Sequence, residues 1–185
     1  MRQEDKIKEL EDVLSPLALK IMQINSKDAY VKFVVPGDGN AEAATLLRDI
    51  HPSALFLRPP LDADDANAVL SALWLWHDWL DESHRISQSI HTPAGSFWHA
   101  IMHRREGDFS NSKYWYARCR NHPALDEVLA LQQELTGKQD INAFVDLCER
   151  VHDSPGHDQR EHAQRLQRIE WFALFTRTVR SAISQ

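Results

Sequence analysis

Cysteine, long apolar runs and excess positive charge are all scarce in this 185-residue sequence. Its two cysteines, Cys119 and Cys148, lie in segments of helical periodicity and in no nucleophile motif, so we expect reduced core residues in a cytoplasmic protein. No stretch approaches the roughly 18 uncharged apolar residues of a membrane span, and the mixed-charge start is unlike a secretory signal. The net charge of −6 argues against a dedicated nucleic-acid-binding protein.

The overall composition is that of an ordinary globular protein. Hydrophobic residues make up 43% and charged residues 26%, which argues against general disorder, and the length suits one domain with a substantial core. Apolar residues recur every three or four positions along most of the chain, as they do in amphipathic helices. We therefore predict a single all-α domain over residues 1–185. Its core is a set of helical hairpins at residues 66–123, with flanking and capping helices at residues 1–65 and 124–185.

Local signals divide the regions that flank this core. One apolar helical face runs through residues 5–23, and Pro16 should kink or split that helix. Residues 30–35 have a strand-like composition but no partner strand, so we expect an extended connection. Asn40 can cap a short helix that follows it. After a break at residues 153–156, a long final helix is expected to close the bundle.

The centre of the chain contains a repeat, in which residues 77–93 recur as residues 107–123 at an offset of 30. The aligned pairs are Asp78 with Asp108, Trp79 with Phe109, Asp81 with Asn111, Ile86 with Tyr116, and Pro93 with Pro123. Each copy has the pattern of the second helix of a hairpin, with the aspartate as N-cap and the proline past the helix end. An apolar segment precedes each copy, at residues 66–76 and 97–106, and Ser96 is the expected N-cap of the second segment. No third copy is detectable.

The second copy resembles the tetratricopeptide repeat family. Its matching positions are Ala100 and Ser112 as small residues, Gly107 and Asp108 as the inter-helix turn, Tyr116 as the aromatic residue and Pro123 as the terminal proline. The offset of 30 rather than about 34 departs from the family pattern, as do His77 in place of glycine and Glu82 in place of a small residue. The resemblance implies helical hairpins and a peptide-binding groove.

Two strings in the same region carry a second resemblance. They are D-E-S-H-R-I-S-Q at residues 81–88 and W-H-A-I-M-H-R-R-E-G-D at residues 98–108. Both are similar to strings in a family of uncharacterised, mostly bacterial proteins. This second resemblance implies no function.

The helices that contain these strings carry polar stripes. His99, His103 and Glu106 lie at i, i+4 and i+7, on one face of their helix. The residues that share one face of the preceding helix are His77, Asp81, His84 and Gln88. In an antiparallel hairpin, His84 comes level with His103, and Asp81 comes level with Glu106.

If the two stripes face each other, they form a metal site. Imidazole nitrogen and carboxylate oxygen together suit zinc, iron, manganese or nickel, and an open position on such a divalent transition metal can activate water. The predicted ligands are His84, His99, His103 and Glu106, with Asp81 or Glu82 as a supporting partner or general base. The zinc-peptidase motif is not present, because Ala100 follows His99 where that motif has glutamate. The alternative is that the stripes are solvated faces, or that each histidine binds a neighbouring backbone or carboxylate group.

A local concentration of positive charge predicts a different kind of site. Arg104, Arg105 and Lys113 could bind a small anionic ligand, because the planar fork of arginine pairs bidentately with carboxylates and phosphates. The alternative is a charged solvent face, in which these cations pair with nearby carboxylates. The carboxylates in question are Glu82, Glu106 and Asp108.

Three functions are compatible with these patterns. The leading prediction is a non-catalytic scaffolding module that binds a peptide or protein partner, because the hairpin resemblance implies one. The rival prediction is a small metal-dependent, hydrolase-like enzyme that uses the cluster of histidine and glutamate. The third is a protein that binds an anionic metabolite through its arginines and Lys113.

Overall fold

Helices form the regular structure of the computed structural model, which describes residues 3–154, 156 and 158–184. Within those residues there are ten α-helices, one 3-10 helix and no strand, so the predicted all-α class is confirmed. In chain order the elements are α1 (Gln3–Lys8), α2 (Pro16–Gln23), α3 (Ala41–Leu47), η1 (Pro52–Leu55), α4 (Ala63–Trp76), α5 (Leu80–Ser87), α6 (Pro93–Glu106), α7 (Phe109–Tyr116), α8 (Pro123–Thr136), α9 (Ile141–Asp153) and α10 (Arg160–Ala182).

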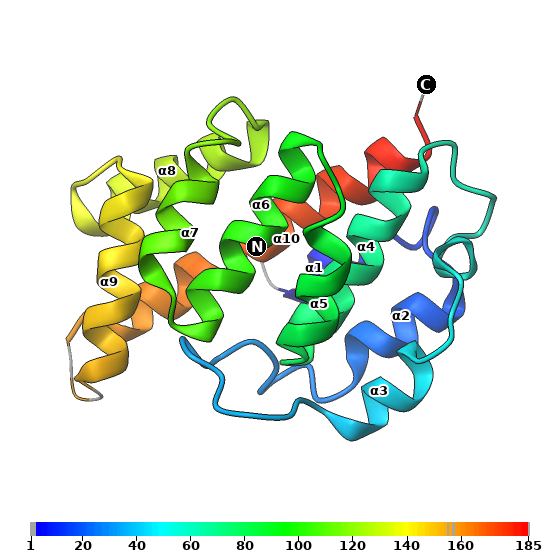
Figure 1. Cartoon of the computed structure of the whole chain (residues 1–185), viewed down its shortest axis with the longest axis horizontal. Helices are drawn as coiled ribbons and strands as arrows, with labels where there is room; N and C mark the ends of the chain where they lie inside the picture. Colours follow the sequence, from blue (N-terminus) through cyan, green and yellow to red (C-terminus); the bar gives the residue numbers. More distant parts are fainter. Residues whose placement is uncertain (1–2, 155, 157, 185) are drawn as a thin grey trace.

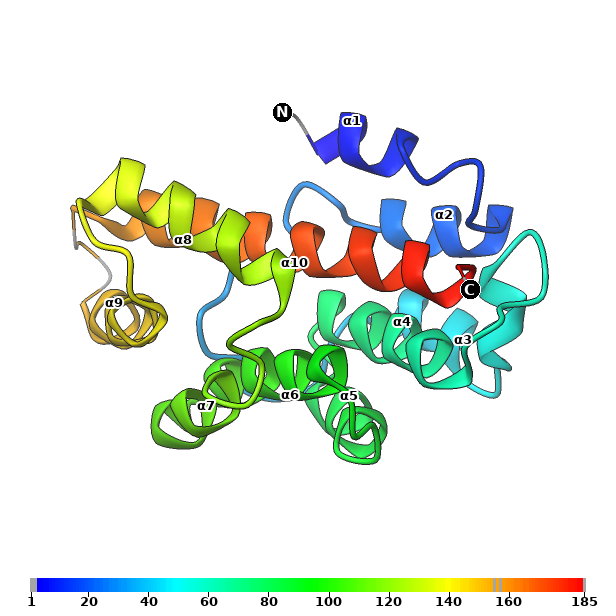
Figure 2. The same ribbon diagram turned by 90° about the horizontal axis from the view of Figure 1, so that it is seen from above.

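The longest helix, α10, runs through the middle of the molecule (Figure 2). Helix α8 lies along its N-terminal half and α4 along its C-terminal half. Helix α10 buries side chains along nearly its whole length, and they include the polar Gln167 and Glu170 as well as apolar residues. Trp171 is at the centre of this packing, with ring centroids 4.4 Å from Phe175 and 4.5 Å from Trp76. The predicted long final helix is confirmed, but it lies at the centre of the bundle and does not close one side of it.

The central region contains the predicted helical hairpins, α4 with α5 and α6 with α7 (Figure 1). Each hairpin brings its helices close together at small residues. The Ser71 hydroxyl donates to the Ser83 carbonyl at 2.9 Å, and the Ser112 hydroxyl donates to the Ala100 carbonyl at 2.8 Å. Helix α6 also packs against α5 and α4, so the two hairpins stack.

The 30-residue spacing continues further than the sequence comparison detects. Helices α4, α6 and α8 begin at residues 63, 93 and 123, and all three have 14 residues. Gly107 and Gly137 end α6 and α8 with φ values of 92° and 69°, in the left-handed region that favours glycine. However, α8 packs along α10, and it is α9 that packs against α7. The 30-residue spacing therefore predicts where α8 begins, but it does not predict which helix α8 packs against.

The two aligned aspartates have different roles, and the expected capping role of Asp78 is wrong. Asp108 caps α7 by accepting from the Asn111 amide at 3.0 Å. The residue at the cap of α5 is Trp79, which makes no side-chain capping bond. Asp78 has a φ of 67°, and its carboxylate pairs instead with Arg105 at 2.7 Å and Lys32 at 2.9 Å. These two cations, which are distant from Asp78 in sequence, hold its carboxylate away from the start of α5.

Helix α6 begins earlier than predicted, at Pro93, and Ser96 lies inside it. The cap is Thr92, whose hydroxyl oxygen accepts from the Gly95 amide at 3.1 Å. Proline suits the first helical position because it has no N–H to satisfy there. Gly95 faces Ile90 so closely that an added Cβ would lie 2.4 Å from the Ile90 carbonyl oxygen. This contact keeps the turn between α5 and α6 tight.

An extended segment at residues 29–40, here named the strap, connects the N-terminal helices to α3 (Figure 1). It has no helix or strand from residue 31 to residue 40, so the predicted extended connection is confirmed. Side chains of α10 hold its backbone, with Gln167 donating to the Tyr30 carbonyl at 3.1 Å and Gln164 to the Val31 carbonyl at 3.2 Å. The Val35 amide donates to the Arg105 carbonyl at 2.9 Å, which ties the strap to the C-terminal end of α6.

Candidate metal centre

Three histidines from two helices converge between α5 and α6. His84 comes from α5, and His99 and His103 come from α6. The His84 ring centroid lies 4.8 Å from that of His99 and 5.2 Å from that of His103, and the last two lie 4.5 Å apart. One ring nitrogen from each lies within 4.8 Å of the others. The predicted alignment of His84 with His103 is thus confirmed.

The surroundings of the cluster hold its rings in place and leave one side open. His99 stacks on Trp115 of α7, with ring centroids 4.2 Å apart and an interplanar angle of 21°. His99 and His103 are only 4% and 5% exposed, whereas His84 is half-buried. A ligand could therefore reach the cluster from the side of His84.

A carboxylate and an amide accompany His103. The Glu106 carboxylate lies 2.5 Å from its Nδ1, which leaves Nε2 as the nitrogen for a metal. The Asn111 amide nitrogen lies 3.1 Å from Nε2 and 3.3 Å from Nδ1. A donor that is nearly equidistant from both nitrogens lies over the ring face and not along either lone pair. Asn111 therefore does not block the lone pair of Nε2.

The electrostatics favour neutral imidazoles. Burial is the main cause that lowers the pKa of His99 to about 4, and repulsion from the neighbouring His103 and His84 contributes to the same shift. Burial is also the main cause of the lowered pKa of His84, followed by repulsion from His103. Both rings are therefore neutral near pH 7, as metal ligands must be. Nδ1 of His99 is buried and has no hydrogen-bond partner among the described residues, which leaves it free to bind an ion.

The donor set and its spacing fit a zinc-like ion. Three histidines with an open fourth position are one of the ligand sets of catalytic zinc, with Zn–N bonds of about 2.0–2.1 Å. In a tetrahedral site with such bonds, the centres of two coordinating imidazole rings are about 5 Å apart. The observed centroid distances, 4.5 to 5.2 Å, are close to this value.

The predicted carboxylates divide between supporting and distant positions. Glu106 is not part of the group of three histidines, and its carboxylate contacts Nδ1 of His103. Together with Asp108 and His103, Glu106 forms a second, more exposed group. Asp81 is exposed, lies one turn before His84, and lines a cavity of about 290 Å³ together with Glu106. Glu82 instead pairs with Arg85. Of the two candidate bases, Asp81 is therefore the one whose carboxylate has no hydrogen-bond or ion-pair partner within the described part of the chain.

Arg104 lies in the core, although the sequence predicts it in a site for a soluble anion. Its guanidinium is 0% exposed and pairs with Glu170 of α10, which is also 0% exposed. The other oxygen of Glu170 accepts from the Tyr116 hydroxyl at 2.5 Å. Cys148 and Gln167 lie against the same guanidinium, at 3.6 and 3.3 Å. An anion from solvent could reach Arg104 only by displacing this internal partner.

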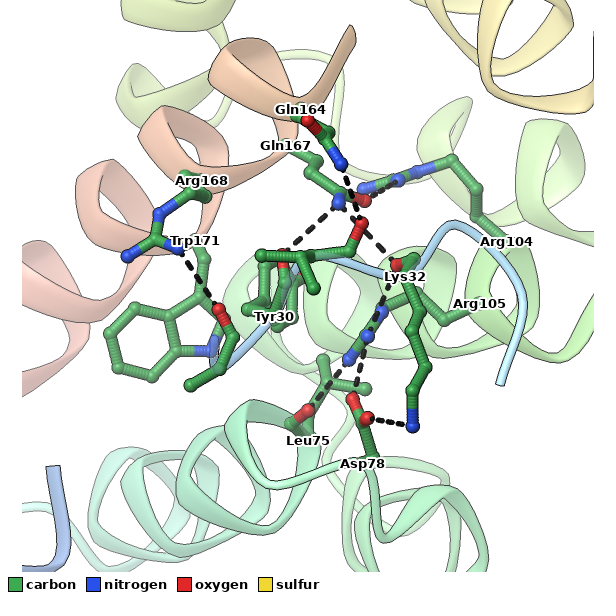
Figure 3. A network of polar contacts seen from close by, with 12 residues as sticks. Tyr30, Lys32, Leu75, Asp78, Arg104, Arg105, Gln164, Gln167, Arg168 and Trp171 are labelled. Carbon is green, nitrogen blue, oxygen red and sulfur yellow. Dashed lines mark hydrogen bonds and ion pairs between the residues drawn. The ribbon is translucent and has the colours of Figure 1, made fainter. Parts of the chain in front are cut away.

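Arg105 and Lys113 are also engaged elsewhere. Arg105 is 0% exposed and donates to the Leu75 carbonyl at 2.8 Å, the Lys32 carbonyl at 3.2 Å and the Asp78 carboxylate at 2.7 Å (Figure 3). Lys113 pairs with Asp146 of α9. The three predicted anion ligands therefore do not converge, and their partners are not those that the sequence suggests. No local pattern could reveal pairs such as Arg104 with Glu170, because 66 residues separate them.

The two thiols are not activated. Cys119 and Cys148 are buried and free, which agrees with their predicted core positions. Burial is the main cause that raises the pKa of Cys119 to about 12 and that of Cys148 to about 11. Both remain protonated near pH 7 and are therefore poor nucleophiles.

Comparisons with known proteins found no match, so the function is inferred from the geometry of the site. No family model matches the chain, and no curated protein or solved structure matches it either. In the described part of the chain, no helix is both long and apolar enough to cross a membrane.

Proposed function

We propose that this protein is a metal-dependent hydrolase whose centre is a zinc-like divalent ion held by His84, His99 and His103. The convergence of three imidazoles carries the proposal, since it supplies ligands of the right type within a short distance of one another. The bound ion would act as a Lewis acid and lower the pKa of a coordinated water to about 7.

The surrounding side chains have roles that fit this chemistry. Glu106 fixes the orientation of His103 through Nδ1, as carboxylates commonly do for metal-bound histidines. Trp115 fixes the ring of His99. Asp81 would take a proton from the attacking water, because its carboxylate lines the adjacent cavity and is close enough to His84 to offset part of the lowering of that histidine's pKa.

A binding module for peptides or proteins is the second candidate, and one surface favours it. Leu57 and Leu61 are 53% and 60% exposed, and they line a cavity of about 560 Å³ with Val13 and Ile183. This surface lies at the C-terminal end of α10 and not on the stacked hairpins. Leu61→Ser should abolish partner capture if the surface is functional, while leaving metal binding unchanged.

Metal binding is the first test of the proposal. Protein purified without chelator or affinity-tag metal should contain close to one zinc-like ion per chain by elemental analysis. His84→Ala and His103→Gln should each weaken zinc binding at least about 100-fold, with an unchanged circular dichroism spectrum. His91→Ala is the matched control, because His91 is exposed just after α5 and outside the cluster. Folded protein that binds no zinc, manganese or iron would overturn the proposal.

Hydrolysis is the second test, with p-nitrophenyl acetate as the probe ester. The zinc-loaded protein should hydrolyse the ester faster than the metal-free protein. Asp81→Asn should lower kcat about 100-fold, in the range for lost general-base catalysis. Glu82→Gln, one residue further along α5, should leave kcat unchanged because Glu82 already pairs with Arg85. Equal effects of the two variants would remove Asp81 from the mechanism.

A further inference from the structure

We infer that the cavity beside the metal centre is a subsite for a positively charged group, so that the substrate carries an ammonium or a guanidinium close to the bond that is cleaved. This inference rests on the proposed hydrolase function, and it adds the chemical class of the substrate. It is drawn from the charges, the walls and the position of one cavity.

The cavity has a volume of about 290 Å³, which suits a small substrate or one long side chain. It lies between the strap, the start of α5 and the end of α6. Carboxylates reach it from each of these elements and from the turn after α4. They are Asp38, Asp78, Asp81, Glu82 and Glu106.

Only some of these carboxylates are neutralised by protein cations. Asp78 pairs with both Lys32 and Arg105, and Glu82 pairs with Arg85. Asp38 and Asp81 have no cationic partner among the described residues. The cavity therefore keeps two uncompensated negative charges from different elements, and a cationic group would be attracted to it.

The remaining walls suit the apolar part of such a substrate. The Trp79 indole is fixed, because its N–H donates to the Asn40 carbonyl at 2.9 Å and its ring packs edge-on against Trp74, with centroids 6.2 Å apart. A guanidinium or ammonium over this ring would gain a cation–π interaction. Leu80 and Val35 add an apolar surface for an alkyl chain.

Glu106 connects the cavity to the metal centre. Its carboxylate contacts Nδ1 of His103 and also lines the cavity, so one side chain separates a bound cation from the histidine cluster. None of the three histidines lines the cavity, so Glu106 is the side chain that the cavity and the cluster share. A substrate whose positive group enters the cavity would therefore present its neighbouring bond to a metal-bound water.

Calorimetric titration with three probes of similar size tests the inference: butylguanidinium, pentanoate and pentan-1-ol. Each is titrated at low ionic strength into both zinc-loaded and metal-free protein. Butylguanidinium should bind to both forms, and the other two probes should not bind measurably. Asp38→Asn should weaken butylguanidinium binding about fivefold to tenfold and leave zinc affinity unchanged. Glu134→Gln, which removes an exposed carboxylate far from the cavity, is the control.

The outcomes separate this inference from the proposed function. If pentanoate or pentan-1-ol binds as well as butylguanidinium, or if Asp38→Asn has no effect, the cationic subsite is overturned while a zinc-binding centre stands. If butylguanidinium binding depends on Asp38 but the protein binds no metal, the subsite stands and the hydrolase proposal fails. Added salt should weaken butylguanidinium binding, and salt-independent binding would also contradict the inference.

Discussion

Replacing Glu170 by glutamine tests whether the buried charges of α6 hold the fold together or serve a ligand. Glu170 accepts from both Arg104 and Tyr116, and all three side chains are 0% exposed. Hydrogen bonds that involve a charged group contribute about 1.5–3 kcal/mol each, and breaking a buried ion pair costs about 3–5 kcal/mol. Glutamine keeps one acceptor oxygen, so Glu170→Gln should cost about 3 kcal/mol.

Urea and thermal unfolding measure this cost. For a chain of this size, about 3 kcal/mol should lower the Tm by about 6–12 °C. The same substitution at an exposed pair is the control. Glu127 accepts from Arg177 at 2.7 and 3.0 Å, but both side chains are about 40% exposed, so Glu127→Gln should cost less than about 1 kcal/mol.

The comparison can refute the assignment of Arg104 to the core. If Glu170→Gln costs no more than Glu127→Gln, the buried pair contributes little, and Arg104 becomes available for an anionic ligand. Phosphate should then stabilise the Glu170→Gln variant against heat. The double variant Arg104→Met/Glu170→Leu should be more stable than Glu170→Gln, because it leaves no unpaired buried charge.

Three further results are expected. Folding lowers the pKa of His99 from 6.5 to about 4, so protons bind the unfolded chain more tightly in that range. In urea unfolding, the free energy of unfolding of the metal-free protein should therefore fall by about 2 kcal/mol between about pH 7.5 and about pH 5. His99→Asn should remove this pH dependence, whereas His91→Asn should leave it unchanged. In the same assay, Asp108→Ala should cost about 1 kcal/mol because a helix cap is lost. Asp78→Ala should cost about 3 kcal/mol because Arg105 stays buried without its carboxylate partner. Equal costs would contradict the different roles of the two aspartates. Zinc at about 100 times its Kd should stabilise the native protein by about 2.7 kcal/mol in thermal unfolding, and an unchanged Tm would count against the metal centre.

The candidate site was partly visible in the sequence. Histidines four residues apart on one helix, and a third on the preceding helix, needed only an antiparallel hairpin to meet. That made His84, His99 and His103 predictable as a group. The supporting contacts were not predictable, because Trp115 reaches His99 from another helix, and because the choice between Asp81 and Glu82 depends on which carboxylate Arg85 engages.

The sequence by itself determined the helices, the caps at Asn40 and Asp108 and the polar stripes, because these depend on residues three or four positions apart. The helix start at Asn40 and the break at Pro16 follow the same local rules. Only the tertiary structure decided which charges are buried, since Arg104 and Arg105 have the local pattern of a solvent-facing cationic run. Their true partners come from α10 and from the turn after α4, and chain folding alone brings those groups together.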